Sequence, residues 1–110
     1  MGKHQSRTPL PRVTLSVRFL PLARLELIEA RDWYARRAAD LGEAFVSEVD
    51  RVVGLISDNP SGYPLMLSDV RRARLRRYPY SLFFRIVGDE CFVLACFHAK
   101  RNPRRWQERA

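Results

Sequence analysis

The sequence predicts an α+β domain in which a helical hairpin packs on one face of a mostly antiparallel sheet, in the order β-α-α-β-β-β. Three observations predict this class. Residues 13–19 alternate apolar and polar side chains, as a half-buried strand does. Residues 20–58 then show helical periodicity twice, with almost no connection between the two stretches. Residues 71–98 close the domain with strand-like runs, so strands and helices are segregated along the chain.

The first strand is VTLSVRF, and the first helix follows it directly. Pro21 suits the first turn of a helix, where a backbone N–H is not needed. One helical face then recurs at three- and four-residue spacing, and it comprises Leu20, Ala23, Leu27, Ala30, Tyr34 and Ala38. Trp33 sits beside this face and widens it, and Tyr34 should bury its ring. We therefore interpret Asp32, Trp33 and Tyr34 as structural residues.

The second helix is predicted from Asp40 to the Asn59-Pro60 pair. Asp40 and Glu43 resemble a capping box with Asp40 as the N-cap. The apolar period continues through Leu41, Phe45, Val49, Val52 and Ile56. Pro60 disfavours helical geometry in the residue before it, so the helix ends there. The acidic residues on the two helices are predicted to be solvated, and they comprise Glu26, Glu29, Asp32, Glu43, Glu48 and Asp50.

The C-terminal half is predicted to supply the rest of the sheet. Residues 61–69 are a loop, and residues 71–87 are a strand, a break at Pro79 and another strand. After a turn at 88–90, the nearly continuous apolar run 91–98 is typical of a central strand that is buried on both faces. Pro103 then starts a short terminal helix.

Composition indicates one domain of modest size. The chain has 110 residues, of which 46% are hydrophobic, so we expect a flexible leader over 1–12 and a single domain over 13–110. No apolar run approaches the ~18 residues of a membrane span. The basic N-terminus is not followed by the apolar stretch of a signal peptide. We therefore expect a cytoplasmic protein without membrane contact.

The two cysteines are predicted to be reduced apolar fillers. Cys91 and Cys96 lie five positions apart in one predicted strand, and this odd spacing places them on opposite faces. Two cysteines and two distant histidines do not form a recognised zinc spacing. We expect no metal and no cofactor.

Positive charge is concentrated at the C-terminal end. The formal net charge is +8, and residues 71–110 carry eleven basic against three acidic residues, whereas residues 21–70 carry five against nine. Such a field favours a polyanion or an acidic protein segment as partner. The alternative is a general contribution to solubility.

Two arginine-rich stretches carry the candidate partner-binding residues. In RRARLRR, 71–77, strand alternation places Ala73 and Leu75 inside and a basic stripe outside, although a charged edge strand that prevents aggregation has the same pattern. After the last strand, Trp106 either packs back on the domain or anchors a contact. The candidate set is Arg72, Arg74, Arg76, Arg101, Arg104, Arg105 and Trp106.

Residues 15–109 resemble the RelE/ParE superfamily of type II toxin–antitoxin toxins. The resemblance is carried by FLPLARLELIEARDWY at 19–34, LGEAF at 41–45, NPSGYP at 59–64, RRARLRRYPYSLFFRI at 71–86 and HAKRNPRRW at 98–106. It implies a small cytoplasmic growth inhibitor that a cognate, ParD-like antitoxin binds and blocks in a toxin–antitoxin hetero-oligomer. RelE-like members cut mRNA on the ribosome, whereas ParE-like members poison DNA gyrase and are not nucleases.

Departures from the nuclease pattern favour the ParE-like branch. Trp106 stands where the nucleases have a tyrosine, and an indole N–H has no proton-transfer chemistry near pH 7. Tyr80 and Ser81 stand where an arginine is expected, and the only lysines are Lys3 and Lys100. The resemblance therefore implies a gyrase poison that acts by contact.

Two alternatives stay open. The first is a metal-independent, ribosome-dependent mRNA endonuclease that would use His98, Arg77, Arg85 and Arg101, joined by Tyr78 or Tyr80. His98 also has a plain structural interpretation, as a strand-end residue that is hydrogen-bonded to a neighbour. The second alternative is a non-toxic basic module that binds nucleic acid, with affinity that falls steeply with salt.

Overall fold

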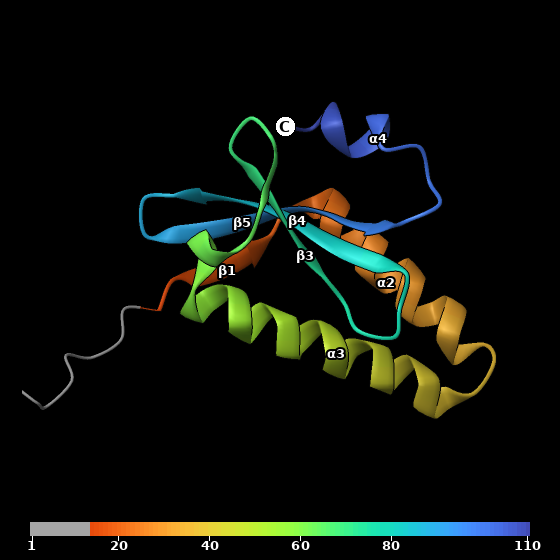
Figure 1. The fold of residues 1–110 in the computed structure, drawn as a ribbon. Helices are drawn as coiled ribbons and strands as arrows, with labels where there is room; N and C mark the ends of the chain where they lie inside the picture. The colour runs from red at the N-terminus through yellow and green to blue at the C-terminus, as the bar shows by residue number, and fades with distance from the viewer. Residues whose placement is uncertain (1–13) are drawn as a thin grey trace, which may run out of the picture.

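The fold is the predicted α+β domain (Figure 1). The computed structural model describes residues 14–110, so the predicted leader over 1–12 and Val13 lie outside the described residues. The elements are β1 (Ser16–Phe19), α2 (Pro21–Ala35), α3 (Ala39–Asp58), the 3₁₀ turn η1 (Pro60–Gly62), β2 (Leu65–Leu67), β3 (Val70–Arg74), β4 (Tyr80–Val87), β5 (Glu90–His98) and α4 (Arg104–Gln107). Within the predicted loop 61–69, the short strand β2 was not foreseen.

The sheet has the strand order β1-β5-β4-β3-β2. β1 pairs with β5 in parallel, and all other neighbours are antiparallel. β5 lies between β1 and β4 and is almost entirely buried, which confirms the prediction of a central strand. α2 and α3 cover one face of the sheet, while α4 and the β2–β3 hairpin rise on the other (Figure 1).

The helical hairpin is held close by small residues. Ala23 and Ala30 of α2 are buried, and a Cβ added to Gly42 of α3 would lie 2.8 Å from the Cβ of Ala35. The predicted cap at Asp40 is wrong. α3 begins at Ala39 with Ala38 in the N-cap position, so Asp40 is already helical and its side chain caps nothing. Its charge still favours the positive end of the helix dipole.

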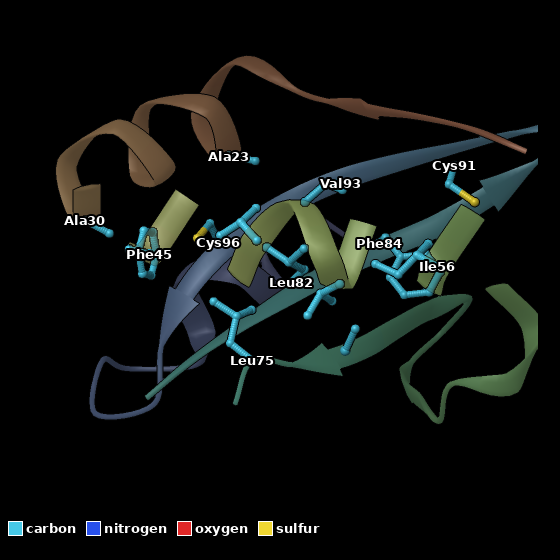
Figure 2. Close-up of a cluster of buried hydrophobic side chains, with 13 residues drawn as sticks. Ala23, Ala30, Phe45, Ile56, Leu75, Leu82, Phe84, Cys91, Val93 and Cys96 are labelled. Atoms are coloured by element: carbon cyan, nitrogen blue, oxygen red, sulfur yellow. The ribbon is translucent and has the colours of Figure 1, made fainter. Parts of the chain in front are cut away.

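The main core fills the space between the helices and the sheet (Figure 2). Phe45 and Ile56 of α3 belong to the same buried cluster as Leu82 and Phe84 of β4, as the predicted helical and strand periods require. Burial of these side chains is the main source of stability in a domain of this size.

A β-bulge overturns the prediction for the two cysteines. The β4–β5 register pairs Phe83 with Ala95 but Phe84 with Val93, so Leu94 is an extra residue in β5. The bulge reverses the alternation between positions 91 and 96. Cys91 and Cys96 therefore face the same core rather than opposite faces (Figure 2), and both are free and buried.

The basic strand is shorter than predicted. β3 ends at Arg74, and residues 75–79 form the hairpin loop in which Leu75 N–H donates to the Tyr80 carbonyl at 3.0 Å. Arg77 has φ of 66°, a left-handed conformation that cannot continue a strand. Arg76 and Arg77 therefore lie in a loop, although Leu75 is buried as expected.

Glu26 and Glu48 are not the solvated residues that helix periodicity predicted. β1 ends at Phe19, which pairs with Val93, so this edge of β5 has no strand partner beyond Val93. Side chains complete that edge: Cys96 N–H donates to Glu26 Oε1 at 3.0 Å, and the Leu94 carbonyl accepts from Arg109 Nη1 at 2.9 Å. Glu48 accepts two bonds from Arg51, each at 2.8 Å, and one from the Arg76 backbone at 2.6 Å.

The described residues contain neither a membrane-spanning helix nor a metal-binding cluster. Between residues 14 and 110, no helix is both long and apolar enough to cross a membrane. The same part of the chain holds no group of three or more side chains that would ligate a metal ion.

Candidate functional site

A groove crosses the sheet face that lies opposite the two long helices. We call it the open-face groove; its volume is about 540 Å³, and α4 and the β2–β3 hairpin wall it. Its lining includes Met66, Arg72, Arg74, Tyr78, Tyr80, Ser81, Phe83, Phe97, His98, Arg101, Trp106 and Gln107. The sheet supplies the floor because β3, β4 and β5 run side by side beneath it.

The floor of the groove is aromatic and holds α4 in place. Trp106 stacks on Phe83 with ring centroids 4.1 Å apart and an interplanar angle of 17°. Phe97 lies edge-on to Phe83 at 6.3 Å. Trp106 is only 4% exposed, so the packing interpretation of this residue is confirmed. A short helix after Pro103 is confirmed as well.

Every charged residue that lines the described part of the groove is an arginine. Arg72 and Arg74 enter from β3, and Arg101 enters from the turn after β5. Arg72 Nε is buried and has no hydrogen-bond acceptor within residues 14–110. Leaving a buried donor unpaired has a cost in free energy, and an acceptor carried by a partner would relieve it. The groove is thus suited to carboxylate or phosphate oxygens.

The remaining candidate arginines lie elsewhere. Arg104 and Arg105 are exposed on α4. Arg76 lies in the hairpin loop beside α3 and lines a third hollow with Glu48 and Arg51. The structure therefore brings three of the six candidate arginines, and Trp106 beneath them, to one groove.

His98 is held by hydrogen bonds at the end of β5. Its Nδ1 accepts from the Lys100 backbone N–H at 3.0 Å, so the neutral ring carries its proton on Nε2. The Arg101 backbone N–H donates to the His98 carbonyl at 3.1 Å. The His98 ring meets Tyr80 edge-on at 5.0 Å. The structural interpretation of His98 thus describes its contacts well.

The four residues of the nuclease hypothesis are dispersed. Arg85 forms an ion pair with Asp69 at 3.1 Å. Arg85 lies toward the C-terminal end of β4, whereas Tyr80, which pairs with His98, is the first residue of that strand. Arg77 is exposed in the hairpin loop and lines the third hollow. Only His98 and Arg101 come together.

Tyr80 keeps its proton at neutral pH. Burial, reinforced by Tyr34, raises the pKa of the Tyr80 hydroxyl above its ordinary value, and Arg101 lowers it less. A tyrosine in this state donates hydrogen bonds and does not act as a base near pH 7. Tyr80 lines the groove in this protonated state.

A second hollow lies between α2 and the turn that follows β5. We call it the α2-side hollow; its volume is about 560 Å³, and its lining comprises Glu26, Glu29, Ala30, Trp33, Tyr34, Arg36, Pro79, Tyr80, His98 and Arg101. Four of these residues also line the open-face groove and form a ridge between the two: Pro79, Tyr80, His98 and Arg101.

Sequence reasoning missed the second hollow because it treated Trp33 and Tyr34 alike. Tyr34 is half-buried, and its ring stacks on Phe45 with ring centroids 5.2 Å apart. Trp33 instead is 42% exposed. The signal was present in the helical period, since position 33 lies beside the apolar face and not within it.

Comparisons with known proteins agree with the fold. Residues 17–103 match the family described as the ParE toxin of type II toxin–antitoxin system, parDE. A chain of the chromosomal ParDE system from P. aeruginosa superposes with a TM-score of 0.70 at 21% identity, over 79% of this chain and 98% of that chain. A chain of the toxin–antitoxin complex RelBE2 from Mycobacterium tuberculosis gives 0.59 at 25% identity, over 82% and 98%. No curated protein matches the chain.

Proposed function

Since this chain belongs to the ParE toxin family of type II toxin–antitoxin systems, we propose that it poisons DNA gyrase by protein contact and that a cognate antitoxin neutralises it. The proposed site of action is the cytoplasm. One observation carries the choice of a contact mechanism over a nuclease: the four residues that a nuclease would use are dispersed over three parts of the molecule. General acid–base catalysis needs its groups within hydrogen-bond reach of one substrate.

The open-face groove is the proposed docking site of the antitoxin. Met66 is 40% exposed in the wall of the groove, above the buried aromatic floor, and suits the apolar side of an amphipathic segment. The arginines of the groove suit acidic residues along the flank of that segment, and Arg72 Nε would gain an acceptor. The resulting toxin–antitoxin hetero-oligomer would bury the cationic surface of the toxin.

A supercoiling assay tests the proposal. Purified gyrase from the native host is incubated with relaxed plasmid and ATP, with and without the purified chain, and supercoiled and linear DNA are scored. We expect loss of supercoiling with accumulation of linear product, and restoration by the antitoxin. Unchanged supercoiling with an active gyrase of the native host would refute gyrase as the target.

A ribosome-dependent mRNA endonuclease is the second candidate, and one observation favours it. His98, Tyr80 and the arginines 72, 74 and 101 all line the open-face groove, so proton donors and cations do meet there. Cleavage of mRNA on purified ribosomes, lost in H98A, would support this candidate. A chain that affects neither gyrase nor translation but binds nucleic acid with a steep salt dependence would be the non-toxic module.

A further inference from the structure

Trp33 is exposed, contacts two neighbouring side chains and lines the α2-side hollow. Among residues 14–110 it is the most exposed aromatic side chain. The Arg37 guanidinium lies 3.5 Å from the centre of its ring, and Tyr34 packs edge-on at 4.9 Å. A side chain that is already fixed loses little entropy when it binds, so Trp33 is suited to be a contact anchor.

The surroundings of Trp33 carry net positive charge. The ion pair with Arg109 neutralises the charge of Glu26. Among the described residues, Glu29 is then the one carboxylate that lines the α2-side hollow without an ion pair. Arg36 and Arg101 line the same hollow, and Arg37 lies over the Trp33 ring. Three guanidinium groups against one carboxylate favour an acidic partner segment.

We propose that the α2-side hollow is the surface that contacts the target of the toxin. It would take an apolar or aromatic side chain from an acidic segment of that protein, which is gyrase if the proposed function, on which this inference rests, is correct. Tyr34 and Tyr80 supply apolar walls, and Trp33 and Arg36 supply the rim. Tryptophan, tyrosine and arginine are the residue types that dominate the energetics of protein interfaces.

The shared ridge explains how an antitoxin would block this surface without filling it. Arg101 and Tyr80 line both the open-face groove and the α2-side hollow. An antitoxin segment in the groove engages Arg101 from one side, and the target segment requires the same guanidinium from the other. The two partners would thus compete at the ridge, although most of their contacts lie on different surfaces.

Variants of the full chain separate the two surfaces. Trp33→Ala and Arg36→Glu alter the α2-side hollow, and Arg74→Ala alters the groove. The matched control is Leu25→Ala, because Leu25 is 55% exposed on the same helix and lines neither hollow. For each variant we would measure the concentration that inhibits gyrase by half, the affinity for the cognate antitoxin and the thermal midpoint of unfolding.

We expect Trp33→Ala and Arg36→Glu to weaken gyrase inhibition by about tenfold or more, with antitoxin affinity retained. Arg74→Ala should give the reverse pattern, and Leu25→Ala should change neither property. Arg36 is exposed, so Arg36→Glu reports on contact even if Trp33→Ala unfolds.

Three outcomes would count against the inference or its premise. If the wild-type chain does not inhibit gyrase, the proposed function itself fails. If the wild type inhibits and both hollow variants inhibit equally well, the inference is wrong while the function stands. If the hollow variants lose antitoxin affinity together with gyrase inhibition, the hollow belongs to the antitoxin surface and the inference is also wrong.

Discussion

Glu26 and Arg109 lie 83 positions apart in the chain and form a two-pronged ion pair, with Nη2 to Oε2 at 2.8 Å and Nη1 to Oε1 at 2.9 Å. Their side chains are 11% and 21% exposed. The hydrogen bonds that Arg109 donates to the Glu26 carboxylate raise the pKa of Arg109 above its ordinary value. The pair ties the C-terminal residues to α2 and completes the edge of β5, so the intervening turn with Arg101 is anchored at both ends.

Glu26→Gln should destabilise the fold by about 2 kcal/mol, because Arg109 loses its counter-ion in a partly buried position. The amide oxygen of the glutamine would still accept from Cys96 N–H, so the loss of stability would come mainly from the missing negative charge beside Arg109. Urea unfolding at neutral pH measures it. Glu29→Gln is the matched control, since Glu29 is exposed on the same helix, and it should leave the midpoint unchanged. Equal midpoints for both variants would contradict a stabilising pair.

Trp106→Ala should cost about 3 kcal/mol, because it removes a buried ring that stacks on Phe83 and leaves a cavity under α4. The substitution should increase the rate of amide hydrogen exchange more for residues 104–107 than for β4. Arg105→Ala on the exposed side of α4 should change stability by no more than about 0.5 kcal/mol. Similar unfolding midpoints for the two variants would show that α4 is not held by this stack.

The Glu48–Arg51 contact should make stability depend on pH. Hydrogen bonds from Arg51, and to a lesser degree from the Arg76 backbone, lower the pKa of Glu48 below its ordinary value of 4.5. A lowered pKa in the folded state means that the contribution is present above pH 4.5 and is lost as the pH falls through the folded pKa. The Glu48→Gln variant should therefore have a lower thermal midpoint of unfolding than the wild type at pH 7, and the two midpoints should converge at acid pH. A constant difference from pH 7 to pH 2 would contradict this.

His98→Ala should reduce gyrase inhibition far less than Arg101→Ala does, because the His98 side chain accepts from the Lys100 backbone N–H and is not part of an assembled catalytic group. The supercoiling assay measures this directly, with Arg101→Ala as the comparison that should impair inhibition. For a nuclease, loss of a general acid or base would instead reduce mRNA cleavage by about 100-fold or more. That result would favour the second candidate function, a ribosome-dependent mRNA endonuclease.

Both thiols should resist alkylation in the folded protein. Cys91 and Cys96 are buried, and burial, with Glu26 as a smaller contributor, raises the pKa of Cys96 to about 12. Thiolates are the reactive form, so a disulfide reagent at pH 8 should react only after denaturation. Rapid reaction of one equivalent in the native state would show that one end of β5 opens.

The local character of the helices and of every strand except β2 could be predicted from sequence. The alternation of Val17 and Phe19, the period of Phe45 to Ile56, and the breaks at Pro60 and Pro79 depend on neighbouring residues alone. The family resemblance and the burial of Trp106 were correct for a related reason, since motif order and the size of an indole are visible without coordinates.

The tertiary structure decided what depends on residues that are distant in the chain. The bulge at Leu94 placed Cys91 and Cys96 on one face, and no local pattern announces an extra residue in a strand. Glu26 looked solvated until Arg109 and the open edge of β5 came next to it. The assembly of Arg72, Arg74 and Arg101 in one groove, and the separation of Arg85 and Arg77 from His98, likewise follow from strand order and register. Side-chain periods determine which face of an element is buried, whereas only packing determines which elements share that face.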